Sequence, residues 1–120
     1  MKTAANLVVA LVAILHLYFM MLEMVFWTRP LGRKVFGLSA DFAEASKRLA
    51  ANQGLYNGFL AAGLIWSLTL GDAGFAIKVF FLVCVLVAGA FGAATVSRKI
   101  LWVQALPAAV ALVLLFFAPP

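Results

Sequence analysis

Two ionisable side chains lie inside an apolar stretch near the start of the chain. His16 and Glu23 both fall within the stretch from Leu7 to Trp27, whose other residues are almost all apolar. Their spacing is nearly two turns of an α-helix, so both side chains would lie on one helix face. A helix of this length spans the apolar core of a bilayer, where an ionisable group is costly and usually serves a function. We therefore interpret Glu23 and His16 as candidate catalytic residues of an intramembrane site.

The composition favours a protein that crosses the membrane several times. Hydrophobic residues make up 67% of the 120 residues and charged residues only 11%. A soluble domain of this size needs more polar surface. Four apolar segments predict crossings at about 7–27, 55–70, 75–96 and 100–118. We predict an all-α, integral membrane four-helix bundle that forms a single domain over residues 1–120.

The second crossing is predicted to begin outside the membrane. Ser39 can cap a helix, and Asp41 follows in the first turn, where an acid interacts favourably with the helix dipole. No helix breaker stronger than Gly54 separates this segment from the apolar one that follows. We therefore expect one helix over about 40–70, with an amphipathic first part that extends into the cytoplasm.

Glycine and proline mark the connections between the helices. Pro30, with two nearby glycines, predicts a surface loop after the first helix, and residues 71–74 predict a tight turn. Gly89 and Gly92 would let a neighbouring helix approach closely. Pro107 lacks a backbone N–H and predicts a kink in the fourth helix, near Gln104.

The distribution of basic residues predicts the orientation in the membrane. Most of the nine lysines and arginines fall in the segments 28–51 and 97–99. Only Lys2 and Lys78 fall on the other side, with Lys78 expected to reach the interface. The positive-inside rule then places both loops in the cytoplasm and both termini outside. Because the basic residues lie beside membrane ends, their function is topological, and we do not expect nucleic acid as a partner.

Three predicted helices place polar side chains at one depth, near the cytoplasmic side. Glu23 and Gln104 each lie four residues, roughly 6 Å, inside their apolar segments, and Asn57 lies near the same end of its own segment. His16 would lie about 10 Å deeper, so a water or a bound molecule would have to connect it to Glu23. The candidate ligand-binding residues are Trp27, Asn52, Gln53, Tyr56, Asn57 and Gln104.

Structural roles compete with these functional ones. The amides can hydrogen-bond across helices, at perhaps 0.6 kcal/mol each, and His16 can donate to a backbone carbonyl. Trp27 can belong to the aromatic belt at the membrane interface. Glu23 is harder to explain as packing, because a leucine would avoid the cost of its carboxyl group. With one cysteine, Cys84, and one histidine, the chain has neither an internal disulfide nor a zinc site, and no cofactor is indicated.

Several stretches together carry a family resemblance: HLYFMMLEMVFW, GRKVFGL, AANQGLYNGFLAAGL and AGAFGAATVSRKILWVQALPA. They resemble the small bacterial four-helix membrane proteins grouped as domain-of-unknown-function family thirteen-zero-four. The resemblance covers nearly the whole chain and implies a multi-pass protein of the bacterial inner membrane. It marks the same polar positions, from His16 to Gln104, and implies no particular reaction.

Three functions remain open at the level of the sequence. The first is an inward-facing pocket that binds or modifies a lipophilic small molecule, with Glu23 as acid, base or counter-ion. The second is proton-coupled transport by an intramembrane glutamate, although the strong charge bias argues for one fixed orientation. The third is a structural or assembly role without a ligand. The lipid bilayer is the expected surrounding in each case, and a homo-oligomer stays open.

Overall fold

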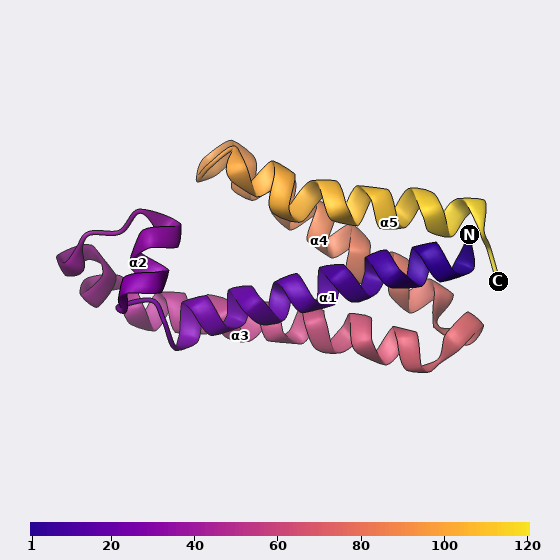
Figure 1. Ribbon diagram of the computed structural model, residues 1–120, viewed down its shortest axis with the longest axis horizontal. Helices are drawn as coiled ribbons and strands as arrows, with labels where there is room; N and C mark the ends of the chain where they lie inside the picture. Colours follow the sequence, from indigo (N-terminus) through magenta and orange to yellow (C-terminus); the bar gives the residue numbers. More distant parts are fainter. The chain divides into compact units, whose positions relative to one another are not determined.

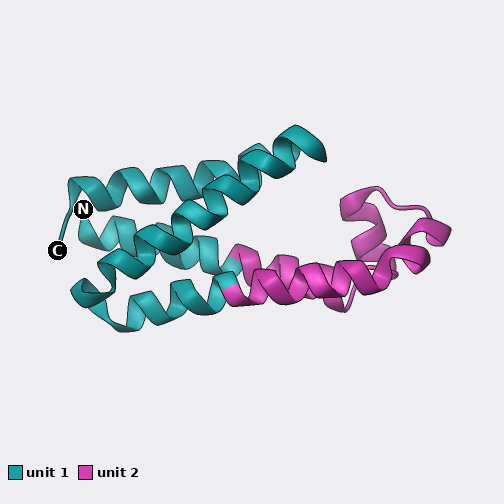
Figure 2. Ribbon diagram, turned by 180° about the vertical axis from the view of Figure 1, so that it is seen from behind, with its two compact units in different colours: residues 1–14, 60–120 teal, residues 15–59 magenta.

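A computed structural model describes residues 1–120 and contains only helices, which confirms the all-α prediction (Figure 1). The chain divides into two compact units, one formed by residues 1–14 and 60–120 and the other by residues 15–59 (Figure 2). Two long helices, α1 and α3, contribute to both units. The elements in order are α1 (Lys2–Met24), α2 (Pro30–Phe36), α3 (Ala40–Thr69), the 3₁₀ turn η1 (Gly71–Gly74), α4 (Phe75–Thr95), the π-helical turn η2 (Leu101–Ala105) and α5 (Leu106–Phe117).

The first unit, residues 1–14 and 60–120, is built around one apolar core. It is formed by the first half of α1, the end of α3, and the helices α4 and α5. Ala5, Val9 and Val12 follow the spacing that places them on one face of α1, and all three are buried. Their partners in the core include Leu64, Leu82, Val85, Ala108, Ala111, Leu112 and Leu115.

Glycines of α4 allow the close helix contact that the sequence predicted. A Cβ added at Gly89 would lie 2.7 Å from the backbone nitrogen of Ala105 in η2. One added at Gly92 would lie 3.1 Å from Cγ2 of Ile100. At Gly89, α4 therefore contacts the backbone of η2 directly, and a side chain at this position would push the two segments apart.

The irregularity expected near Gln104 is present, and it is a π-helical turn. The turn η2 spans Leu101–Ala105, and the N–H of Leu106 donates to the carbonyl of Leu101. Pro107 follows directly on this turn as the second residue of α5, and it has no N–H to donate to a carbonyl of the turn. The wider π-helical turn thus accommodates the proline ring and its missing hydrogen bond.

Lys78 extends back toward the turn that precedes α4, and its place at a membrane interface stays a prediction. Its side chain is buried, and its Nζ donates to the carbonyl of Gly71 at 3.1 Å. This carbonyl lies just beyond the end of α3, so the lysine finds an acceptor closer than water. Lys2 and Asp72 form an exposed ion pair of 3.0 Å in the same unit.

In the second unit, residues 15–59, the predicted loop over 28–37 is largely a helix, so that prediction was wrong. Pro30 begins α2 with a backbone angle suited to a first turn, and Gly37 ends it at φ 65°. A Cβ at Gly32 would lie 2.0 Å from the carbonyl oxygen of Phe26. The helix α2 is therefore packed against the segment that follows α1.

The long helix α3 is continuous over Ala40–Thr69, as predicted. Ser39 accepts a hydrogen bond from the N–H of Phe42 at 3.2 Å, which caps the start of the helix. Gly54 does not interrupt the helix.

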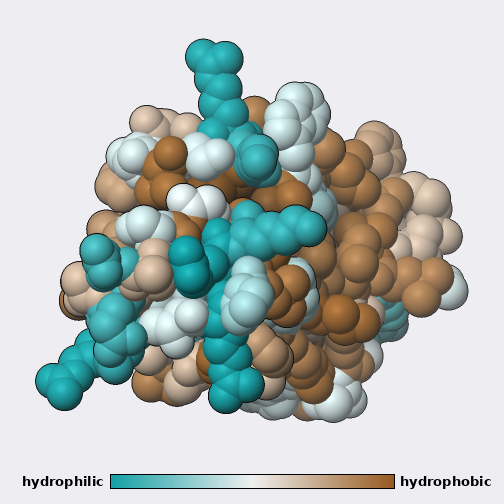
Figure 3. All heavy atoms as spheres, turned by 60° about the vertical axis from the view of Figure 1, so that its left-hand side comes forward, coloured by the Kyte–Doolittle hydropathy of each residue, from teal (hydrophilic) through white to brown (hydrophobic).

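Two segments are long and apolar enough to cross a membrane, Lys2–Met24 and Gly71–Thr95. The helical segment Leu101–Phe117 is apolar but shorter. Large apolar side chains such as Leu7 and Phe80 are more than half exposed. In contrast, Figure 3 shows hydrophilic side chains gathered at the end of the molecule that carries α2. Four crossings stay a prediction, and so does their grouping into one domain.

The contact between α4 and η2 can be tested by adding a side chain. Gly89→Val should lower the free energy of unfolding by about 1–3 kcal/mol, because the new atoms meet the backbone of Ala105. Ala90→Val, on an exposed position of the same helix, is the matched control. Thermal unfolding in detergent, followed by circular dichroism, measures both. Equal midpoints for the two variants would show that the segments are not in backbone contact.

Candidate functional site

A cavity of about 270 Å³ lies in the second unit, at the end of α1. Its volume is close to the lower limit of about 300 Å³ for small-molecule sites. One wall comes from the end of α1 and the following turn, with Glu23, Met24, Val25, Trp27 and Thr28. The other comes from α3, with Lys47, Arg48 and Ala51.

The carboxyl group of Glu23 is held by an amide from α3. The side-chain nitrogen of Asn57 donates a hydrogen bond to Oε1 of Glu23, and Asn57 is only 7% exposed. No ion pair involves Glu23: the chain's two ion pairs are Lys2–Asp72 and Lys47–Glu44. The carboxyl group is therefore partly buried with a neutral partner from the protein and no cation.

Glu23 lies closer to the end of its helix than the sequence predicted. The apolar stretch continues to Trp27, but α1 ends at Met24, because the chain turns at residues 25–29. The carbonyl oxygens of a last helical turn carry partial negative charge. No basic residue lies in the last turn of α1 to offset that charge. The end of α1 thus adds its negative potential to that of the Glu23 carboxyl group.

Two glycines of α3 allow Glu23 and Asn57 to meet. A Cβ at Gly54 would lie 3.0 Å from Cβ of Glu23 and 3.1 Å from the carbonyl oxygen of Met20. One at Gly58 would lie 2.8 Å from Sδ of Met20. Sequence reasoning treated Gly54 only as a weak helix breaker. The four-residue spacing of these glycines, which is typical of close helix contacts, was the signal that could have revealed them.

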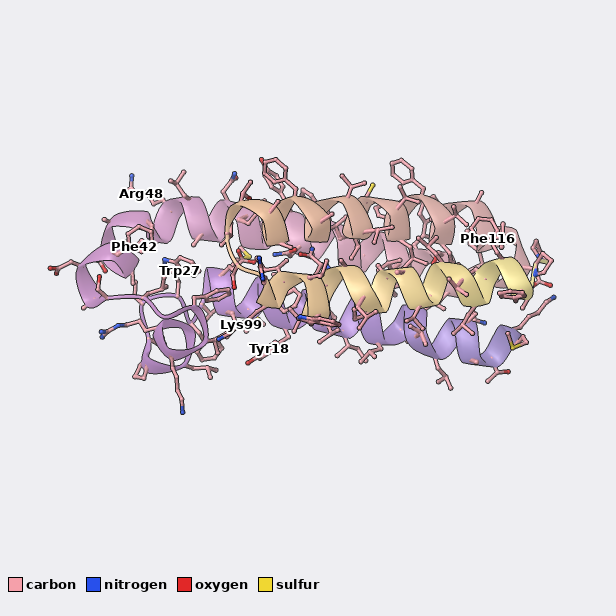
Figure 4. All side chains as sticks on the ribbon, turned by 90° about the horizontal axis from the view of Figure 1, so that it is seen from above. Tyr18, Trp27, Phe42, Arg48, Lys99 and Phe116 are labelled. Carbon is pink, nitrogen blue, oxygen red and sulfur yellow. The ribbon has the colours of Figure 1, made fainter.

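Trp27 connects the turn after α1 with both following helices. Its indole Nε1–H donates to Oγ of Ser46 in α3 at 3.0 Å, and its ring lies 5.0 Å from that of Phe36 in α2. Ser46 in turn donates to the carbonyl of Phe42 at 2.6 Å. Figure 4 shows Trp27 beside α3 at this end of the molecule. Ser46, which sequence reasoning missed, therefore fixes one wall of the cavity.

The two basic residues of the cavity wall have other surroundings. Lys47 pairs with Glu44, one helical turn earlier on α3. Arg48 is exposed and makes no ion pair, and in Figure 4 its side chain extends away from Trp27. Both nevertheless line the same cavity as Glu23.

The remaining predicted site residues lie in different surroundings. Asn52 and Gln53 are exposed, and Tyr56 is 49% exposed with its ring 6.2 Å from that of Phe59. His16 is fully buried, and the centroid of its ring lies 5.3 Å from that of Phe19 in an edge-to-face arrangement. Gln104 is half-buried in η2 of the first unit. Of the predicted set, the structure pairs Glu23 with Asn57 and places Glu23 and Trp27 in the lining of one cavity, and all the functional assignments stay predictions.

Comparison with known proteins identifies the family. The family model described as "Protein of unknown function (DUF1304)" matches residues 10–116. This chain belongs to the DUF1304 family. It is similar to "Uncharacterized protein YpaA" of Lactococcus lactis subsp. lactis (strain IL1403), with 31% identity over 109 residues, which are 89% of this chain and 92% of YpaA. No solved structure matches the chain.

The hydrogen bond between Asn57 and Glu23 can be tested with two substitutions of one residue. Glu23→Gln keeps a side-chain oxygen for Asn57 and should unfold at nearly the wild-type temperature. Glu23→Leu should lose about 1–3 kcal/mol of stability, because the buried amide of Asn57 then lacks its acceptor. Thermal unfolding in detergent compares the two variants. If Glu23→Leu and Glu23→Gln unfold at the same temperature, the hydrogen bond from Asn57 to Glu23 does not contribute to stability.

Proposed function

We propose that this DUF1304 protein is a four-helix membrane protein whose cavity at the end of α1 binds a lipophilic small molecule. The observation that carries the proposal is the combination of a partly buried acid with an apolar wall in one cavity. Glu23 supplies the polar group, and Met24, Val25 and Trp27 supply apolar surface. Small-molecule sites typically have this composition, with a few polar groups in an apolar surround.

The helices support a location in the membrane. The helix α1 is long and apolar enough to cross a membrane, and basic residues follow it in α2 and in the first part of α3. By the positive-inside rule, the cavity then opens near the cytoplasmic face of the cell membrane, with both termini outside. A lipophilic ligand could reach it from the inner leaflet. Glu23 would serve as acid, base or counter-ion for that ligand, and the cavity suits binding as well as modification.

The orientation can be tested by cysteine labelling in intact cells. In a Cys84→Ala background, Lys34→Cys places a thiol on an exposed position of α2, and Pro120→Cys places one at the last residue. An impermeant maleimide should label Pro120→Cys in intact cells and Lys34→Cys only after the membrane is opened, because the basic segments face the cytoplasm. Labelling of both from outside would overturn the proposed orientation.

Binding in the cavity can be followed through Trp27. The other tryptophans, Trp66 and Trp102, are both more than half exposed and can be replaced by phenylalanine. In this single-tryptophan protein, a bromine-tagged long-chain alcohol should quench Trp27 fluorescence in a saturable manner. Ala51→Phe fills the cavity and should remove saturation. Ala45→Phe, on an exposed position of α3 outside the cavity, should retain it.

Non-saturable quenching that is equal in both phenylalanine variants would contradict a binding cavity. That result would favour a structural role without a ligand. A saturable signal that survives Ala51→Phe would place the binding site elsewhere on the protein.

A further inference from the structure

We propose that the ligand of this cavity is a lipophilic cation, an amine or quaternary ammonium compound with an apolar chain. This inference rests on the proposed function, because it names the chemical class that the same cavity takes. Three features of the cavity carry it: the charge of Glu23, the end of α1 and the aromatic wall at Trp27.

The first feature is an acid that lacks a cation. Glu23 is partly buried and accepts a hydrogen bond from Asn57, but no lysine or arginine pairs with it. A buried carboxylate without a counter-charge is costly, so it is balanced either by a proton or by a cation brought from outside. An ammonium ligand supplies that charge, and a partly buried carboxylate attracts it more strongly than one in bulk water does.

The second feature is the helix end on which Glu23 lies. The helix α1 ends at Met24, and its last turn holds no basic residue. Carbonyl oxygens of a last turn favour a nearby cation by about 0.3–1 kcal/mol, and more where the site is partly buried. A bound ammonium group would therefore interact favourably with both the carboxyl group and the helix terminus. An anionic ligand would be repelled by both.

The third feature is the half-buried indole of Trp27 in the cavity wall. Tryptophan is the side chain that attracts cations most strongly through its ring face, and aromatic walls recognise quaternary ammonium groups. Trp27 is held in place by Ser46 and Phe36, so this wall is formed before a ligand binds. Met24 and Val25 add apolar surface for an attached chain.

Two basic residues of the same cavity, Lys47 and Arg48, oppose this preference. Their effect is reduced because Lys47 is already paired with Glu44, and Arg48 is exposed and extends away from Trp27 (Figure 4). Glu23, the end of α1 and Trp27, by contrast, favour a positive charge.

The test compares three bromine-tagged probes with the same chain length and different head groups: trimethylammonium, alcohol and carboxylate. Each is titrated against the protein that retains Trp27 as its single tryptophan, in uncharged detergent. The trimethylammonium probe should bind about tenfold more tightly than the alcohol, and the carboxylate should bind least. The same titrations in Glu23→Gln provide the decisive control. That variant keeps the size of the side chain and the acceptor for Asn57, and it removes the charge.

In Glu23→Gln, the preference for trimethylammonium over the alcohol should fall to about twofold or less, the remainder coming from the helix end and Trp27. Because each preference is a ratio within one detergent, differences in probe partitioning cancel between the two proteins. Equal binding of all three probes to the wild type would overturn the cationic ligand but leave a lipophilic cavity intact. A preference that is unchanged in Glu23→Gln would also overturn it. Absence of saturable binding by the alcohol and trimethylammonium probes alike would instead contradict the proposed function itself.

Discussion

The carboxyl group of Glu23 constrains the whole second unit, residues 15–59. It is partly buried at the last turn of α1, and the hydrogen bond that the structure gives it comes from a neutral amide, Asn57. For that contact to form, α1 and α3 must approach closely. Gly54 and Gly58 allow this approach because they have no side chain. A packing feature and a polar feature therefore depend on each other. Without the glycines, Asn57 would not reach Glu23, and without Asn57, the acid would have no partner on α3.

The segment that follows α1 turns this contact into a cavity. The chain turns directly after Met24, and α2 packs back onto that turn through Gly32. Trp27 then spans from the turn to Ser46 of α3 and to Phe36 of α2. The cavity wall that faces α3 is thus formed by the end of α1 and the turn that follows it. The result is a cavity that combines the carboxyl group of Glu23 and the end of α1 with apolar surface from Met24, Val25 and Trp27, which is the basis for a lipophilic cation as its ligand.

Much of this arrangement follows from patterns that the sequence displays directly. Helical content, the continuous helix over Ala40–Thr69, the close contact at Gly89 and the irregular turn at Gln104 were all predicted, because each depends on local composition. The family was also predicted from the sequence, and the match over residues 10–116 confirms it. In the site, Glu23 and Asn57 were predicted as candidates from their depth and residue type, and Trp27 from its place near the same helix face as Glu23.

The errors and omissions concern features that composition alone does not decide. Pro30 and the glycines around it indicated a loop, but a proline is also compatible with the first turn of a helix. The close packing of Gly32 on Phe26 favours the helix in this structure. The hydrogen bond from Lys78 to the carbonyl of Gly71 was not predicted, because it depends on where the end of α3 lies in space. Ser46 gave no signal in the sequence, because its role depends on the position of Trp27.

The most direct measurement of the central claim is photolabelling with a diazirine-bearing lipophilic amine, followed by peptide mapping. If the ligand lies where Glu23, Trp27 and α3 converge, labels should concentrate on Met24, Val25 and Ala51, and excess unlabelled trimethylammonium amphiphile should suppress them. Labels spread over outward-facing residues such as Leu7 and Phe80, without enrichment at the cavity or suppression by the competitor, would contradict the account.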